Sequence, residues 1–279
     1  MIRLGARRAQ RLAALLVWSA AVVTLVVLLL ILAYVLIEGL PRVTLEFLLG
    51  SPQQMGREGG IFPMIVGTLA LTAVAVLIAT PFGVGTAIYL TEFTREGRLT
   101  RIIRFGTESL AGVPSIIFGL FGFVFFVITL GLGWSILSGG LTLAAMILPT
   151  IIRTSEEAIR SVPVAYRDVS FSLGATRWQT VTRAVLPSAL PGITTGIILG
   201  IGRSVGETAA VILTAGSALR MPTSIFSPTR TMAVHFYVLA REGISLEMAY
   251  ATGAVLVISV LVINVIANEA LGRVMAKDR

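Results

Sequence analysis

Two opposite charges inside an apolar stretch are the first residues of this sequence whose types and spacing could do chemistry. The segment GIGRSVGET at residues 200–208 places Arg203 and Glu207 in a run that is otherwise apolar. Ionised groups in membrane-length apolar runs are costly, and they line polar pathways or pair with one another. Residues four apart share a helix face, so we expect Arg203 and Glu207 to pair, with Ser204 and Thr208 beside them. A substrate pathway is the favoured interpretation, and an ion pair that only locks helices together is the alternative.

The same segment contains a GxSxG pattern centred on Ser204, which marks the nucleophile of many serine hydrolases. A hydrolase would also need a base, and His235 is the only histidine; we expect it in an external loop, as a surface or packing residue rather than a metal ligand. The only aspartates, Asp168 and Asp278, fall in segments expected on the other side of the membrane. An intramembrane serine hydrolase is therefore a remote alternative.

A polar segment at residues 160–187 lies between two apolar runs and is too long for a simple turn. Within it, residues 164–173 are expected to form a short helix that begins near Pro163 and stops at Gly174. Two interpretations are open for this helix. Either it lies across the membrane surface, or it is a docking element that a cytoplasmic partner binds.

The elements that must position these residues are long apolar runs. Hydrophobic residues make up 56% of the 279 residues and charged residues only 13%, which is far from the balance of soluble proteins. Several charge-free runs reach the ~20 residues that a helix needs to cross a bilayer. We expect an all-α polytopic transmembrane domain of about six spans, at residues 12–37, 59–91, twice within 109–152 with a break at 131–140, 184–219 and 248–268.

Prolines and glycines interrupt these runs. Each proline removes a backbone donor, and we expect ordinary helix kinks at Pro81, Pro114, Pro149 and Pro191. Glycines recur every four residues in the fifth run, at Gly192, Gly196 and Gly200, which permits close approach of another helix.

The basic residues report topology rather than nucleic-acid binding. The net charge is +8, and with a cytoplasmic N-terminus 16 of the 22 basic residues fall on the cytoplasmic side and 5 outside, while Arg203 lies within a span. This bias predicts that both termini are cytoplasmic. The first run is about twice as long as a signal-peptide core, so we expect a retained first helix. The chain has no cysteine, which excludes disulfides and thiolate metal sites.

The polar segment at residues 160–187 resembles the EAA loop of type I ABC importer permeases. Asp168, Val169 and Ser170 occupy the EAA positions with changed residue types, and the spacing to Gly174 and to Leu186 and Pro187 holds. Within that superfamily, the chain is similar to phosphate importer permeases of PstA type. The similarity is carried by AGVPSIIFGLFG at residues 111–122, LGATRWQTVTRAVLPSALPGI at 173–193, RSVGET, GGIFPMIVGTL near Gly59, and YLTEF ending at Phe93.

The resemblance implies the type I ABC importer permease fold, in a bacterial plasma (inner) membrane protein. It implies a phosphate importer subunit that forms half of the translocation pathway, with a second homologous permease, two ATPase subunits and an external phosphate-binding protein as partners. A coupling helix at about residues 164–176 would be set in a cleft of the ATPase, and the coupling residues would be Asp168, Val169, Ser170, Gly174, Ala175, Leu186 and Pro187.

The chain has no GxxxxGK[ST] motif, so we expect it to be no enzyme and to bind no cofactor, with ATP used by the partner. Residues 1–58 would hold the N-terminal tail, first span and external loop. Residues 59–279 would form the permease core of five spans with the coupling loop at about 160–187. A permease for another oxyanion, such as sulfate or molybdate, remains the alternative.

Overall fold

The computed structural model describes residues 6–277, and helices make up nearly all of its regular structure. π-Helical segments at Tyr89–Phe93, Phe123–Thr129 and Val181–Val185 follow α3, follow α5 and precede α9. The elements are α1 (Ala6–Gly39), α2 (Leu45–Leu49), β1 (Pro52–Gln53), β2 (Glu58–Gly59), α3 (Phe62–Ile88), α4 (Arg98–Ala111), α5 (Ser115–Gly122), α6 (Ile136–Ser161), α7 (Val164–Ser172), α8 (Arg177–Thr180), α9 (Leu186–Val205), α10 (Ala209–Thr214), α11 (Met232–Arg241) and α12 (Leu246–Lys277).

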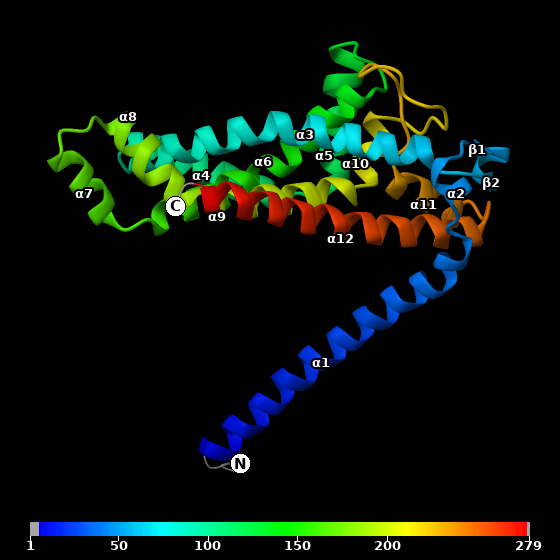
Figure 1. The fold of residues 1–279 in the computed structure, drawn as a ribbon, viewed down its shortest axis with the longest axis horizontal. Helices are drawn as coiled ribbons and strands as arrows, with labels where there is room; N and C mark the ends of the chain where they lie inside the picture. The colour runs from blue at the N-terminus through cyan, green and yellow to red at the C-terminus, as the bar shows by residue number, and fades with distance from the viewer. Residues whose placement is uncertain (1–5, 278–279) are drawn as a thin grey trace.

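Four long helices, α3, α6, α9 and α12, run along the long axis of the molecule (Figure 1). One end carries α7 and α8 and is called the loop end; the other carries α2, the antiparallel pair β1–β2 and α11 and is called the hairpin end. Helix α1 touches α12 near its own C-terminus and then diverges from the bundle. Within the described residues, five helices are long and apolar enough to cross a membrane, or six if the bent pair α4 and α5 is one span. The predicted helical membrane fold is confirmed.

The third predicted span is not the simple crossing that we expected. Helix α4 ends at Ala111, α5 begins at Ser115, and the α4 and α5 segments meet at an angle of 104°. Pro114 occupies the N-cap of α5, where its ring prevents the preceding helix from continuing. The prediction of an ordinary kink was therefore wrong at Pro114. The other three prolines do lie inside helices, at Pro81 of α3, Pro149 of α6 and Pro191 of α9.

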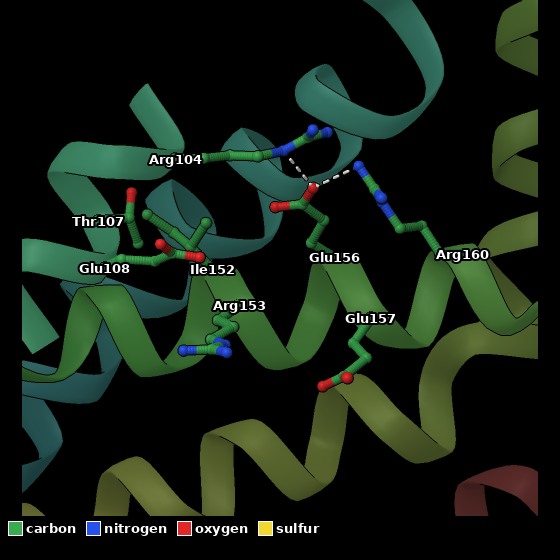
Figure 2. Close-up of a pocket in the computed structure, with 8 residues that line it drawn as sticks. All are labelled: Arg104, Thr107, Glu108, Ile152, Arg153, Glu156, Glu157 and Arg160. Carbon is green, nitrogen blue, oxygen red and sulfur yellow. Dashed lines mark ion pairs between the residues drawn. The ribbon is translucent and has the colours of Figure 1, made fainter. Parts of the chain in front are cut away.

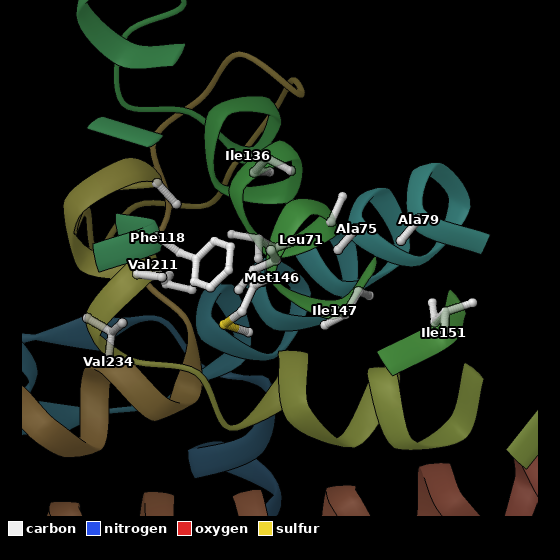
Figure 3. Close-up of a cluster of buried hydrophobic side chains, with 14 of the residues drawn as sticks. Leu71, Ala75, Ala79, Phe118, Ile136, Met146, Ile147, Ile151, Val211 and Val234 are labelled. Atoms are coloured by element: carbon white, nitrogen blue, oxygen red, sulfur yellow. The ribbon is translucent and has the colours of Figure 1, made fainter. Parts of the chain in front are cut away.

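A buried apolar cluster joins α3 to α6 near the middle of the bundle (Figure 3). Leu71 and Ala75 of α3 pack with Met146 and Ile147 of α6, and Phe118 of α5 closes the cluster. In a membrane such contacts stabilise by close van der Waals packing rather than by exclusion of water. The packing fixes α6 against α3, so the polar groups at the ends of these two helices have fixed positions.

The glycines of α9 face α6, as their spacing predicts. A Cβ atom at Gly196 would lie 1.9 Å from Thr154 Oγ1 and 2.8 Å from Thr154 Cβ, and one at Gly192 would lie 2.5 Å from Ala158 Cβ. These positions therefore require a residue without a side chain. By contrast, a Cβ atom at Gly202 in the same helix would meet no atom within 4 Å.

The contrast predicts different costs for two substitutions in one helix. Gly196→Val should lower stability by about 1–3 kcal/mol, because the added carbons force α9 away from α6. Gly202→Ala should leave stability unchanged or raise it slightly, since alanine is the better helix former by about 1 kcal/mol. Thermal unfolding of the detergent-solubilised chain measures both. Equal midpoints for the two variants would show that α9 does not pack closely on α6.

Candidate functional site

The residues of the RSVGET segment lie at a break between two helices. Helix α9 ends at Val205 with Gly206 as its C-cap, and α10 begins only at Ala209. Arg203 is in the last turn of α9, where its positive charge is favoured by the helix dipole. Glu207 falls in the break, and Thr208 is the N-cap residue of α10. The predicted fifth span is thus a long helix followed by a short one.

The break separates the two charges that we expected to pair. Glu207 Oε1 accepts a hydrogen bond from the backbone N–H of Ala210 at 3.2 Å, so its carboxylate is held by the first turn of α10. Among the described residues, Arg203 has no hydrogen bond or ion pair, and its side chain is half-buried. The predicted ion pair was wrong, because a common helix face requires a continuous helix across 203–207. The site instead presents a half-buried guanidinium that is free to donate to an anion.

Ser204 is buried in the last turn of α9. It is 3% exposed, and its hydroxyl has no hydrogen-bond partner among the described residues. A nucleophilic serine needs a base within hydrogen-bond reach. No such base is present around Ser204 in the described part of the chain.

His235 lies in α11 and not in a loop, and it is 1% exposed. Its Nδ1 is 3.4 Å from Nη1 of Arg230, a buried side chain whose Nε also donates to the carbonyl and the hydroxyl of Ser217. Burial and, second, the charge of Arg230 lower the pKa of His235 to about 4, so the ring is neutral at pH 7. His235 is a packing residue at the hairpin end, whereas Asp168 lies at the loop end (Figure 1), so no triad forms among the described residues; Asp278 lies outside them.

A second polar site, which sequence reasoning missed, lies between α4 and α6. It is a cavity of about 220 Å³ (Figure 2) lined by Arg104, Thr107, Glu108, Ile152, Arg153, Glu156, Glu157 and Arg160. Glu156 Oε1 lies 2.8 Å from Arg104 Nε and 2.9 Å from Arg160 Nη2, and Glu96 Oε1 lies 3.1 Å from Arg104 Nη1 and 3.8 Å from Arg160 Nη2, so two carboxylates balance two guanidinium groups.

Arg153 and Glu157 point to another side of α6 than Glu156 (Figure 2), and neither makes an ion pair with a described residue. The predicted fourth span ends at Ile152, whereas α6 continues to Ser161. Its last turns carry Arg153, Glu156, Glu157 and Arg160. Arg203 is therefore one of several charged residues within the described long helices. The i, i+4 spacing of Glu156 and Arg160 on one helical face was the available signal.

The polar loop between α6 and α9 has the predicted helix and stop. Helix α7 follows Pro163 and ends at Ser172, and Gly174 has a left-handed φ of +81°. A capping box then begins α8, in which Thr176 Oγ1 accepts from the Gln179 N–H and Gln179 Oε1 accepts from the Thr176 N–H. Pro163 and Gly174 each act on the adjacent backbone, which explains why the sequence predicts the start and the stop of α7 correctly.

Helix α7 lies at the loop end, beyond the long helices, and the segment that ends at Leu173 exposes apolar side chains to its surroundings. Val169 and Leu173 are 60% and 82% exposed, and no residue of α7 is buried. A cavity of about 370 Å³ lies beside them, lined in part by Ser170, Gly174 and Ala175. Asp168 is exposed on the same helix, and Leu186 and Pro187 form the first turn of α9, where proline is well tolerated. Clustered exposed apolar groups of this kind mark an interaction surface.

These features define a multi-pass helical membrane protein with a polar break after α9 and a protruding loop that exposes apolar side chains. The chain belongs to the family of binding-protein-dependent transport system inner membrane components, whose sequence model matches residues 79–275. It is 35% identical to the probable ABC transporter permease protein YqgI of Bacillus subtilis, over 85% of this chain and 86% of that protein. It is 31% identical to the phosphate transport system permease protein PstA of Pasteurella multocida, over 83% of each chain.

The fold is that of known ABC importers. A chain of a bacterial alginate ABC transporter, crystallised with its alginate-bound periplasmic protein, superposes with a TM-score of 0.70 and 18% identity over 96% of both chains. At this identity the likeness shows the fold alone. The protein is a multi-pass inner membrane permease of type I ABC importer fold.

Proposed function

We propose that this chain is the membrane-spanning permease subunit of an ATP-driven phosphate importer and forms half of its translocation pathway. One observation carries the proposal: a half-buried guanidinium without a described partner, Arg203, lies at a break in a membrane helix. It does so in a chain that shares 31% identity with a PstA permease over most of its length. A permease of this kind has no catalytic activity of its own.

Arginine suits a phosphate pathway for physical reasons. Its planar fork donates two parallel hydrogen bonds to an oxyanion and stays charged in a poorly solvated site. Because Glu207 is held by Ala210 N–H, a passing anion need not displace an internal carboxylate from Arg203. We assign Arg203 to the anion contact, and Glu207, Ser204 and Thr208 to the polar wall around it.

The loop between α6 and α9 is the proposed attachment point of the ATPase. The exposed apolar groups of α7 and the cavity beside Gly174 support this role. We propose that the contact is made or shaped by Asp168, Val169, Ser170, Gly174, Ala175, Leu186 and Pro187. ATP would then be bound and used by the partner, which supplies the energy through this surface.

The remaining arrangement is proposed on the same grounds. The chain would pair with a second homologous permease and two ATPase subunits, and receive phosphate from an external binding protein. The distribution of basic residues supports cytoplasmic termini and a cytoplasmic loop end. Residues 1–58 would add a first span to a permease core of residues 59–279.

Uptake by the reconstituted complex tests the substrate. Proteoliposomes that hold this chain, its partner permease and the ATPase should accumulate labelled phosphate only when ATP and the binding protein are present. Sulfate and molybdate should not accumulate under the same conditions. Accumulation of sulfate or molybdate in place of phosphate would assign the permease to another oxyanion.

A further inference from the structure

A partly buried ion pair joins α7 to the end of α3. Arg167 lies in α7, and Glu92 lies in the π-helical segment Tyr89–Phe93. Arg167 Nε donates to both carboxylate oxygens of Glu92, at 3.1 and 3.3 Å, and Arg167 Nη2 donates to Glu92 Oε1 as well. The side chains are 18% and 9% exposed. Multiple charge-assisted hydrogen bonds of this kind fix geometry as well as distance.

The same guanidinium also closes the end of α6. Arg167 Nη1 donates to the carbonyl of Val162 at 2.9 Å, and Nη2 donates to the carbonyl of Ile159 at 3.1 Å. Helix α6 ends at Ser161, so these carbonyls belong to the turn whose acceptors the helix leaves free. A cation is favoured there by the helix dipole. One side chain of α7 therefore binds the ends of both α3 and α6.

Among the described residues, Arg167 makes the only side-chain hydrogen bonds from α7 to the ends of α3 and α6, and α7 otherwise contacts α8 and the π-helical segment Val181–Val185. None of the residues of α7 is buried, and its exposed apolar groups Val164, Val169 and Leu173 face away from the long helices' packed core. A force applied to α7 therefore reaches α6 through the two-residue connection as well as through Arg167, and it reaches the end of α3 chiefly through the Arg167–Glu92 pair. The two receiving helices are themselves packed together through Leu71, Ala75, Met146 and Ile147.

We infer that Arg167 and Glu92 form a strut that makes α7 move as one body with the ends of α3 and α6. The inference rests on the proposed function, in which the ATPase grips α7. Arg167 and Glu92 are positioning residues in this scheme, since neither touches the transported anion. They deliver the displacement of α7 to α3 and α6, the two helices against which α9, the helix of Arg203, packs.

The number of phosphate ions taken up per ATP hydrolysed by the reconstituted complex tests the strut. Arg167→Met should lower this ratio by about tenfold or more, because it leaves the Glu92 carboxylate without its partner, and Glu92→Gln should lower it by a smaller factor, because the amide oxygen still accepts from Arg167 but carries no charge. The ATPase subunits should still co-purify, since α7 and its exposed surface remain. Glu96→Gln is the matched control: this glutamate lies four residues further along, its side chain is 82% exposed, and the ratio should not change. An unchanged ratio in the first two variants would overturn the strut.

A cross-link separates a strut from an ion pair that only adds stability. The chain has no cysteine, so in a Glu92→Cys/Arg167→Cys variant a short thiol-specific bifunctional reagent reacts with no other thiol of this chain, and the variant is linked before it is assembled with its partners. The unlinked double variant should show the low ratio, and the linked form should regain most of it. A linked form that stays low would refute the strut. If the complex carries sulfate instead of phosphate, the proposed function fails, yet the same ratio measured for sulfate still tests the strut.

Discussion

Replacing Arg203 with glutamine is expected to lower phosphate uptake about 100-fold, with the ATPase subunits still bound to the complex. Glutamine removes two charge-assisted hydrogen bonds to the anion, each of about 1.5–3 kcal/mol, and hydrogen bonds from water to the anion replace part of this loss. Arg203→Lys should also be poorly tolerated, because an ammonium group keeps the charge and loses the fork. Initial uptake rates at several phosphate concentrations measure both variants.

The control for Arg203 is another arginine without an ion pair among the described residues. Arg220 is exposed in the segment between α10 and α11, and Arg220→Gln removes the same charge from the chain. Uptake by this variant should stay close to that of the unchanged chain. Near-normal uptake by the Arg203→Gln complex would leave Arg203 with a structural role at the end of α9 and remove it from the anion pathway.

Glu207→Gln is expected to have a smaller effect than any change at Arg203. The carboxylate accepts from Ala210 N–H, and the amide oxygen of glutamine can accept the same hydrogen bond. The substitution removes the negative charge of Glu207. That charge repels an incoming anion, and it also weakens the binding of the anion at Arg203. The two effects act in opposite directions on uptake.

The elements that the sequence predicts well are those specified by local signals. Apolar runs reveal the long helices, since a bilayer crossing needs a fixed length. The glycine spacing in α9 reveals its packing face, because residues four apart align on a helix. Pro163 and Gly174 reveal α7, because one residue fixes a helix start and the other fixes a stop.

The features that the sequence does not predict depend on neighbours distant in the chain. The break after Val205 contains glycine, glutamate and threonine, none of which forces a helix to end. Backbone groups freed in a membrane helix are tolerated only where protein or water satisfies them. Glu207 accepts from one amide of α10, and Trp134 Nε1 donates to the Leu213 carbonyl from a segment far away in the sequence. Hydropathy alone therefore extends the fifth span through a break.

The bend at Pro114 and the charged end of α6 were missed for a related reason. A proline inside an apolar run is compatible with a kink or with a complete turn, and only packing decides between them. In this chain Gly119 of α5 sits against α10, where an added Cβ atom would lie 2.8 Å from the Cα of Ala210. Similarly, α6 extends past Ile152 with Glu156 placed between two arginines, one of which comes from α4.

Replacing Gly174 with valine is expected to uncouple ATP hydrolysis from transport or to prevent the ATPase from binding. Gly174 follows α7 in a Schellman motif: its N–H donates to the Phe171 carbonyl at 2.9 Å, and the Ala175 N–H donates to the Ser170 carbonyl at 3.0 Å. The motif requires the left-handed φ of +81°. A left-handed backbone costs an ordinary residue about 1–2 kcal/mol, and a β-branched residue is a genuine outlier there.

Within this chain, the surroundings of Gly174 separate backbone strain from steric clash. A Cβ atom at this position would meet nothing within 4 Å, so valine introduces backbone strain and no clash. Gly174→Asn is therefore the matched control, because asparagine tolerates the left-handed conformation while adding a side chain of similar bulk. Gly174→Val should lower phosphate uptake per ATP hydrolysed by about tenfold or reduce co-purification of the ATPase, and Gly174→Asn should keep most of both. Normal coupling in the valine variant would show that the stop after α7 does not shape the ATPase contact.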